Sequence, residues 1–376
     1  MKIAIHAIYY HPEVGGMESH IKDIAEEFVA RGHRVHIVCG SSLPGLVPEE
    51  EIGGVRVTRT RWFGRNQVGW LRYVLASQRT FLRAARDADI VHGQGFPCAL
   101  PVRTARREYG IPGLVTVHSS HFLRLAPQRL LRPGLKWLFA PLDHILTPSA
   151  ELAAAVRLVA PDRQVETYVN SVNTRVFRKT EPALEDRGRA ILVCPRRLVE
   201  KNGVRFAVQA LPLILKTVPS RLYMVGPGPL QAELEALARS LGVADSVVFM
   251  GSQPHDRMPA ILSSADVILI PSLMEATSIA ALESMACERV IAASNVGGLP
   301  EIIDDAIGTL FRPGDPEEIA RRVIGLLGRE RASMGRIARQ RVVDNWSAAR
   351  LADHHLALYR RIIDRFHGSP AATADG

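Results

Sequence analysis

Two glutamates, Glu275 and Glu283, lie eight residues apart where an apolar segment gives way to a helical pattern. The apolar run at residues 266–270 predicts a buried strand of a parallel sheet, and Pro271 ends that strand. The helix expected next contains Glu283, whereas Glu275 lies just before it. At a helical rise of about 1.5 Å per residue the two carboxylates are about 12 Å apart. That separation suits the two ends of one long polar ligand.

The start of the same helix predicts a site for an anion. Either Thr277 or Ser278 can cap the helix, and apolar residues recur at helical spacing from Ile279 onward. The N–H groups and the dipole at a helix start attract negative charge. A diphosphate placed between the two glutamates fits this pattern.

Spacing by itself does not establish a site, because Glu18 and Glu26 are also eight residues apart. Those two lie in an amphipathic helical pattern, and we interpret them as solvated or helix-end charges. For Glu275 and Glu283 the alternative interpretation is a helix-capping acid and a surface glutamate in an ordinary strand–loop–helix turn.

Alternating strands and helices predict two α/β domains in this chain of 376 residues. The cysteines have no CxxC spacing and predict reduced core thiols of a cytosolic protein. No apolar run approaches the ~20 residues that cross a bilayer, and we expect neither a spanning nor a secretion segment. The cysteines are Cys39, Cys98, Cys194 and Cys287.

Loops at the carboxyl ends of the first-half strands predict ligand contacts, because open α/β sheets bind ligands there. Gly15 and Gly16 follow the first strand, where a bare backbone can approach a phosphate or a sugar. His118 ends a strand expected at residues 114–118. It contacts either a sugar hydroxyl or the acceptor, or it is only a hydrogen-bonded histidine at the edge of the sheet.

The second half repeats the pattern after a charged, linker-like stretch at residues 178–189. Arg197 and Lys201 lie in its first strand-to-helix loop, and a glycine–proline loop begins at Gly226. Glu275 lies in a later loop of the same sheet. If the strands are parallel, these loops share one edge, so the cations and the helix start converge where a diphosphate leaving group develops charge.

The positive charge of the chain is concentrated in residues 56–140, with fifteen basic residues against three acidic ones, a net charge of +12. Leucines and aromatic residues alternate there with basic residues, which favours a surface for an anionic membrane or acceptor. A solvated helix face is the alternative, and nucleic acid is not an expected partner. The segment includes Phe122, Arg124, Arg129, Leu130, Leu131, Arg132, Lys136, Trp137 and Phe139.

The ordered segments HPEVGGMESHI, TVHSS, RRLVEKNG, MVGPGPL, ESMACERV and SNVGGLPE give the chain a family resemblance. Their order and spacing resemble those of the retaining nucleotide-sugar glycosyltransferases of family 4. The resemblance runs from Lys2 to about Phe366 and implies the α/β GT-B fold, in which two Rossmann-like domains with parallel sheets face each other across a cleft. It implies domains at 1–180 and 181–350, a returning helix at 351–368 and a flexible tail at 369–376.

The resemblance also implies roles for matched positions. In this family the acid at Glu275 approaches the donor sugar, and the acid at Glu283 holds the ribose hydroxyls. Arg197 and Lys201 match the basic pair that neutralises the diphosphate, and His118 matches a histidine that faces the reaction centre. Donor contacts are expected from Glu283, Gly15, Gly16, Thr277, Ser278, Ile279 and Gly226.

The implied reaction is transfer of a hexose from a nucleoside diphosphate sugar with retention at the anomeric carbon. It needs a stabilised leaving group, and no metal or other cofactor is expected. The only D-x-D, at Asp87 and Asp89, precedes a strand and is interpreted as structural. The family's usual Glu-Gly-Phe-Gly is Glu-Ala-Thr-Ser from Glu275 onward, which leaves the donor sugar open.

Several alternatives remain at this point. The acceptor is either a lipid-linked sugar or glycoconjugate, with the protein cytoplasmic and peripheral to the inner face of the membrane, or a soluble small molecule. Two other classes share the fold, a nucleotide-sugar isomerase and a non-catalytic binding relative.

Overall fold

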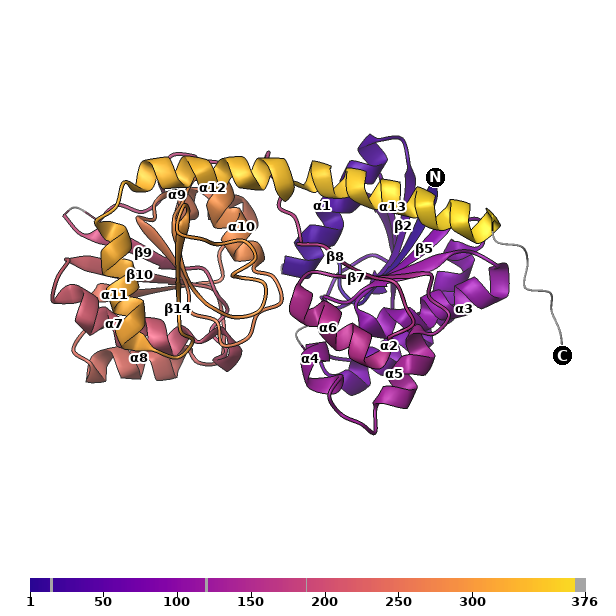
Figure 1. Ribbon diagram of the computed structural model, residues 1–376, viewed down its shortest axis with the longest axis horizontal. Helices are drawn as coiled ribbons and strands as arrows, with labels where there is room; N and C mark the ends of the chain where they lie inside the picture. Colours follow the sequence, from indigo (N-terminus) through magenta and orange to yellow (C-terminus); the bar gives the residue numbers. More distant parts are fainter. Residues whose placement is uncertain (14–15, 119–120, 187, 369–376) are drawn as a thin grey trace. The chain divides into compact units, whose positions relative to one another are not determined.

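The computed structural model describes residues 1–13, 16–118, 121–186 and 188–368 (Figure 1). It divides into two compact units. Unit 1 comprises Met1–Val169 and the segment that begins at Ala348, and unit 2 comprises Asn170–Ser347. Each unit is an α/β layer structure with its own sheet and core.

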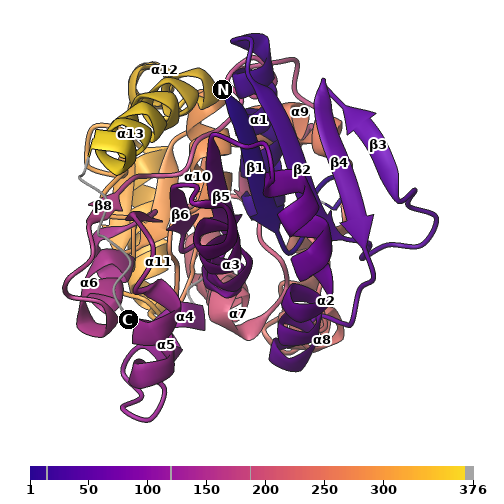
Figure 2. The same cartoon turned by 90° about the vertical axis from the view of Figure 1, so that its right-hand side faces the viewer.

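The sheet of unit 1 has eight strands in the order β3-β4-β2-β1-β5-β6-β7-β8, with β3 and β4 at one edge (Figure 2). All neighbours pair in parallel except β3, which is antiparallel to β4. The strands are β1 (Lys2–Ala7), β2 (Arg34–Gly40), β3 (Glu49–Ile52), β4 (Val55–Thr60), β5 (Ile90–Gln94), β6 (Gly113–Thr116), β7 (His144–Thr147) and β8 (Val165–Thr167).

Helices cover both faces of this sheet because its strands are apolar on both sides. Ile3 and Ile5 of β1 pack with α1 and α13, whereas His6 of the same strand faces Phe81 of α2. Asn66 caps α2 by accepting a hydrogen bond from Gly69 N at 2.8 Å. The helices are α1 (Gly16–Ala30), α2 (Gln67–Ala85), α3 (Ala99–Tyr109), α4 (His121–Leu125), α5 (Arg132–Phe139), α6 (Ala150–Val159) and α13 (Ala348–Gly368).

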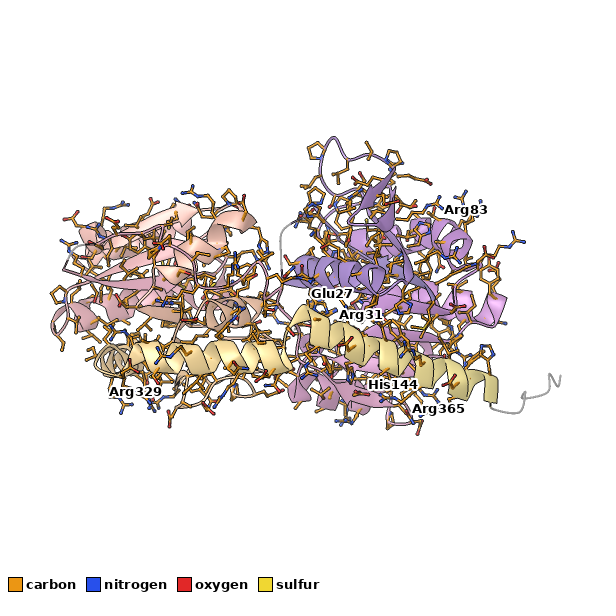
Figure 3. The ribbon with its side chains drawn as sticks, turned by 90° about the horizontal axis from the view of Figure 1, so that it is seen from above. Glu27, Arg31, Arg83, His144, Arg329 and Arg365 are labelled. Carbon is orange, nitrogen blue, oxygen red and sulfur yellow. The ribbon has the colours of Figure 1, made fainter. Side chains whose placement is uncertain are left out.

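Helix α13 completes the core of unit 1 from the far end of the sequence. Its Leu356 and Tyr359 are buried in the same cluster as Phe28 of α1. At the junction of the two helices, Arg31 pairs with Glu27 and donates to Asp353 Oδ1 at 2.8 Å (Figure 3). The returning helix thus belongs physically to unit 1.

The sheet of unit 2 has six strands, all parallel, in the order β11-β10-β9-β12-β13-β14. The strands are β9 (Ala190–Cys194), β10 (Ser220–Val225), β11 (Val247–Gly251), β12 (Val267–Ile270), β13 (Ile291–Ser294) and β14 (Gly308–Phe311). The helices are α7 (Val204–Leu215), α8 (Gln231–Ser240), α9 (Met258–Ser263), α10 (Ile279–Ala286), α11 (Pro316–Leu327) and α12 (Arg331–Asn345).

The boundary between the units precedes the position expected from the sequence, residue 180. Arg339 of α12 donates to the carbonyl oxygens of Thr174 at 2.9 Å and Phe177 at 2.5 Å. Phe177 is buried and contacts the ring of His255. These contacts fasten residues 170–177 to unit 2. The second boundary falls before Ala348 instead of residue 351, and the tail predicted at 369–376 lies outside the described residues.

Candidate active site

The carboxyl ends of the unit 2 strands carry a tightly connected set of loops, which we call the rim. The loop after β9 meets the loop after β12, where the N–H groups of Leu273 and Met274 donate to the Lys201 carbonyl at 2.9 and 3.2 Å. The loop after β10 is tied to the same region, since Leu198 N donates to Pro227 O at 2.9 Å. The expectation that these loops share one edge is confirmed.

Glycines allow the rim loops to pack this closely. A Cβ on Gly226 would lie 2.5 Å from the Arg196 carbonyl oxygen, and one on Gly203 would lie 1.9 Å from that of Pro271. Both glycines also have positive φ, which side chains disfavour. Gly226, predicted as a donor contact, therefore brings bare backbone to the rim.

Helix α10 starts at the rim as predicted. Ser278 is its cap and accepts a hydrogen bond from Ala281 N at 3.2 Å, and the helix begins at Ile279. The other capping candidate, Thr277, is buried beside it. The start of the helix presents backbone N–H groups at the end of the loop that carries Glu275.

Glu275 is paired with an arginine that the sequence interpretation left out. Its carboxylate forms an ion pair with the guanidinium of Arg196, and the two side chains are only 13% and 12% exposed. Arg196 and Arg197 are adjacent and identical, so residue type alone gave no sign of which one turns inward. The sequence feature that could have pointed to Arg196 is this pair of adjacent arginines in the loop after the first strand of unit 2.

The two cations assigned to the diphosphate lie in the loop that precedes α7. Arg197 is exposed, and its carbonyl accepts a hydrogen bond from Asn202 Nδ2 at 2.8 Å. Lys201 is half-buried and holds the neighbouring loop through its own carbonyl. Glu283 is half-buried within α10. The rim thus gathers Arg197, Lys201, Glu275 and the start of α10 in one unit.

His118 lies in unit 1, two residues beyond the end of β6, which stops at Thr116 and not at residue 118 as expected. Its Nε2 lies 2.7 Å from Gln94 Oε1, and its ring meets that of His20 edge-on at 5.3 Å. Burial, and secondarily the neighbouring His118, hold the pKa of His20 well below its usual value. His118, itself half-buried, therefore lies against a buried histidine whose pKa is lowered.

The cluster continues from His118 to α13 through residues that the sequence did not single out. The ring nitrogens of His92 lie 2.6 Å from the Tyr359 hydroxyl and 2.7 Å from Thr116 Oγ1. Gln94 Nε2 lies 3.4 Å from both of these nitrogens. Of the predicted glycine pair in this unit, Gly16 begins α1, and Gly15 lies outside the described residues.

Comparison with known proteins identifies the family. A model described as Glycosyltransferase Family 4 matches residues 14–176, and one described as Glycosyl transferases group 1 matches residues 189–329. A 2-deoxystreptamine glucosyltransferase of Streptomyces kanamyceticus is 30% identical over 364 residues, which cover 86% of this chain and 92% of that protein. The chain belongs to the family 4 glycosyltransferases.

Solved structures give this glycosyltransferase its fold class. Sucrose-phosphate synthase from Thermosynechococcus elongatus superposes with a TM-score of 0.83 at 21% identity, covering 96% of this chain and 98% of that one. HepE of Anabaena, solved in complex with UDP, gives a TM-score of 0.78 at 17% identity, with 96% and 100% coverage. The two α/β units are those of a GT-B fold.

The D-x-D of the glycosyltransferase directly precedes β5, so it lies at the edge of the sheet opposite the carboxyl ends of the parallel strands. Asp89 accepts a hydrogen bond from Lys2 N at 2.7 Å, so it anchors the start of β1. Among the residues that the structure describes, no group of three or more His, Cys, Asp or Glu side chains is placed to hold a metal ion. The four cysteines are free thiols in buried positions, as predicted.

The basic segment of unit 1 divides into core and surface. The prediction that Phe122 and Phe139 belong to this surface is wrong. Both side chains are fully buried, and their ring centroids are 5.8 Å apart. Arg132 donates to the carbonyl oxygens of Ala126 and Pro127 at 3.1 and 3.2 Å. The exposed remainder of the segment is a basic–apolar surface consisting of Arg124, Arg129, Leu130, Leu131, Lys136 and Trp137.

A groove of about 840 Å³ in unit 1 is lined in part by Asp87 of the D-x-D and by basic residues of the segment at 56–140. It runs beside α2 and reaches the amino ends of β1 and β2 at Lys2 and Arg34, with His36, Thr58 and Arg83 among its lining residues.

Within the described ranges, no helix is both long and apolar enough to span a membrane.

Proposed function

We propose that this glycosyltransferase transfers a hexose from a nucleoside diphosphate sugar to an acceptor, with retention at the anomeric carbon and without a metal. The observation that carries the proposal is the rim of unit 2, where Arg197, Lys201 and the start of α10 lie at the carboxyl edge of one parallel sheet. HepE, of the same fold, has been solved with UDP and with UDP-glucose, which supports a nucleotide-sugar donor.

The chemistry follows from the charges at this rim. Departure of a nucleoside diphosphate concentrates negative charge on the β-phosphate as the glycosidic bond breaks. The cations Arg197 and Lys201 and the N–H groups at the start of α10 stabilise that charge in the transition state. The positive charge needed by the leaving group thus comes from the chain itself.

Glu275 and Glu283 hold the two ends of the donor in this proposal. Glu275 receives a hydroxyl of the sugar, and Glu283, further along α10, receives the ribose hydroxyls. Gly226 contributes bare backbone to the diphosphate site in this proposal, and a Cβ there would collide with the Arg196 carbonyl.

For the acceptor we favour a molecule held at an anionic membrane surface. Leu130 is 96% exposed and follows the exposed Arg129, and Trp137 is 54% exposed and follows the exposed Lys136. Helix α2 adds a row of exposed apolar side chains at Val68, Leu71 and Leu75. Apolar side chains flanked by cations suit the boundary of an anionic bilayer. The second candidate is a soluble small molecule, since the Streptomyces relative is named for 2-deoxystreptamine.

The test is a panel of nucleoside diphosphate sugars incubated with the purified protein in the presence of excess EDTA. Release of the nucleoside diphosphate that depends on an added acceptor supports the proposal. Interconversion of donors without an acceptor would identify an isomerase, and binding without turnover would identify a non-catalytic relative. A rate that EDTA abolishes and Mn²⁺ restores would refute metal independence.

A further inference from the structure

Arg196 reaches from one rim loop across to another. It follows β9, where its N–H donates to Cys194 O at 3.0 Å, and its side chain extends to the loop after β12. There its Nη2 lies 2.8 Å from Ser272 Oγ and contacts the Glu275 carboxylate, and its Nη1 lies 3.4 Å from Ser278 Oγ. One guanidinium therefore touches the beginning, the middle and the end of the loop that carries Glu275.

We propose that Arg196 is the positioning residue for Glu275 and thereby a determinant of how the donor sugar is held. The proposal rests on the function proposed above, in which Glu275 receives a sugar hydroxyl. It concerns Arg196, the arginine of the Arg-Arg doublet to which the proposed function gives no role at the diphosphate.

The contacts fix which carboxylate oxygen serves the sugar. Arg196 Nη2 binds Oε2 of Glu275, and Ser272 Oγ lies 3.4 Å from the same Oε2. With two donors on Oε2, we assign Oε1 to the hydroxyl of the donor. The carboxylate then has one oxygen bound by the protein and one oxygen for the ligand, and its plane is set by the planar guanidinium.

Burial makes this pair sensitive to the loss of either partner. Both side chains are about seven-eighths buried, and Arg196 Nη2 has a third acceptor in Asn202 Oδ1 at 3.0 Å. Removing the guanidinium would leave the Glu275 carboxylate with little water and without its counter-ion. The carboxylate would then turn toward solvent, and the loop from residue 272 to residue 278 would lose its common anchor.

Ser278 connects the pair to the start of α10. Its hydroxyl caps the helix by accepting from Ala281 N, and it also accepts from Arg196. A displaced Glu275 loop would therefore also disturb the N–H groups at the helix start. Arg196 thus couples the sugar-binding carboxylate to the anion-binding end of α10.

The experiment compares R196M, R196K and E275Q with the wild type, and includes the double variant R196M/E275Q. The matched control is R331M, which breaks an arginine–carboxylate pair at the opposite edge of the same sheet, where Arg331 Nη2 lies 3.2 Å from Asp266 Oδ1. If R196M loses no more thermal stability than R331M, that loss reflects only the removal of an arginine–carboxylate pair. It is then no evidence that Arg196 positions Glu275.

Hydrogen exchange of the ligand-free protein tests the positioning itself. R196M should accelerate exchange in residues 272–281, which include the Leu273 and Ala281 amides, and R331M should not. R196K keeps a charge that reaches fewer acceptors, so it should give an intermediate rate. Unchanged exchange of this segment in R196M would overturn the proposal, whether or not the protein transfers sugar.

Kinetics then test what the positioning serves. R196M should lower kcat/KM for the nucleotide sugar by ~10², the scale of a misplaced reacting group. Affinity for the nucleoside diphosphate alone should fall much less, because the start of α10 is only one part of the diphosphate site. In the E275Q background R196M should cause little further loss, because Arg196 acts through Glu275. Additive losses of kcat/KM in the double variant, or a loss of nucleoside diphosphate affinity as large as the loss of kcat/KM, would overturn the proposal. A wild type that turns over no donor refutes the proposed function instead, and hydrogen exchange still decides the role of Arg196.

Discussion

Gly297 lies directly against the backbone of Glu275, so that a Cβ at Gly297 would be only 1.7 Å from the Glu275 carbonyl oxygen. The next residue continues this contact, since Gly298 N donates to Ala276 O at 3.1 Å. The loop after β13 therefore packs directly against the backbone of the Glu275 loop, with no room for a side chain between the two.

Replacing Gly297 with Ala should both destabilise the protein and impair turnover. Positive φ alone costs an alanine about 1–2 kcal/mol, and the contact with Glu275 adds to that cost. The control is Gly242→Ala, which has a similar φ of +67° but nothing within 4 Å of the added Cβ. Urea unfolding and donor turnover are measured for both variants. Equal effects on unfolding and on turnover would contradict a specific contact with Glu275.

Arg197→Ala should lower kcat by ~10², the scale of losing one preorganised donor to developing charge. The exposed position of Arg197 means that stability should change little. Arg239→Ala, which removes an exposed arginine near the end of α8, is the control. Activity within a few-fold of the wild type would remove Arg197 from the leaving-group site.

Glu283→Gln should weaken binding of the nucleoside diphosphate by roughly 10- to 100-fold, because a hydrogen bond to a charged group contributes about 1.5–3 kcal/mol. The loss should appear equally with the free nucleoside diphosphate and with the nucleotide sugar, since the ribose is common to both. Isothermal calorimetry measures both affinities. An unchanged affinity for the nucleoside diphosphate would argue against the ribose role.

Stability should fall as the pH drops below about 6.5. Burial lowers the pKa of His6 to about 3 and that of His355 to about 3 in the folded chain, against an ordinary value of 6.5. Between these values the unfolded chain binds more protons, so each histidine removes up to ~1.4 kcal/mol of stability per pH unit of acidification. Urea unfolding at pH 7, 6 and 5 measures the slope. His6→Gln should make it shallower, and an identical slope would count against a buried neutral His6.

Anionic vesicles should bind the protein through the basic–apolar surface. Arg124→Ser with Arg129→Ser should weaken sedimentation with the vesicles at low salt, by about 1 kcal/mol per residue. Leu130→Ser with Trp137→Ser should remove the binding that persists at high salt. The control pair is Arg34→Ser with Arg360→Ser, both exposed in unit 1. A wild type that stays in the supernatant at low salt would refute the membrane proposal.

Parallel strands and their following helices were predictable because they are short apolar runs with helical patterns after them. Strand β12, at Val267–Ile270, lies within the apolar run expected at residues 266–270, and helix α10 begins at Ile279, where the capping residues and apolar spacing predicted its start. Strand β3, whose sequence is Glu-Glu-Glu-Ile, carries no apolar alternation, and it forms because it pairs with β4. Tertiary pairing decided that element.

The location of the site was predictable from the sequence, but the ion pair and hydrogen bonds within it were less so. The backbone of the loop after β9 turns Arg196 inward and Arg197 outward, and no pattern of residue types encodes that choice. Similarly, Phe122 and Arg124 were indistinguishable as members of an amphipathic segment until the packing of Phe122 on Phe139 separated core from surface.

Unit 1 is discontinuous in sequence, and unit 2 is one uninterrupted run of residues inserted within it. On the ribosome, all of unit 2 is therefore synthesised before the segment that carries Leu351, Leu356 and Tyr359, which fill the core of unit 1. The unit that starts first is finished last. Until α13 docks, the nascent unit 1 exposes an apolar strip along α1 and the sheet, and this strip is the stretch of the chain that a chaperone would protect.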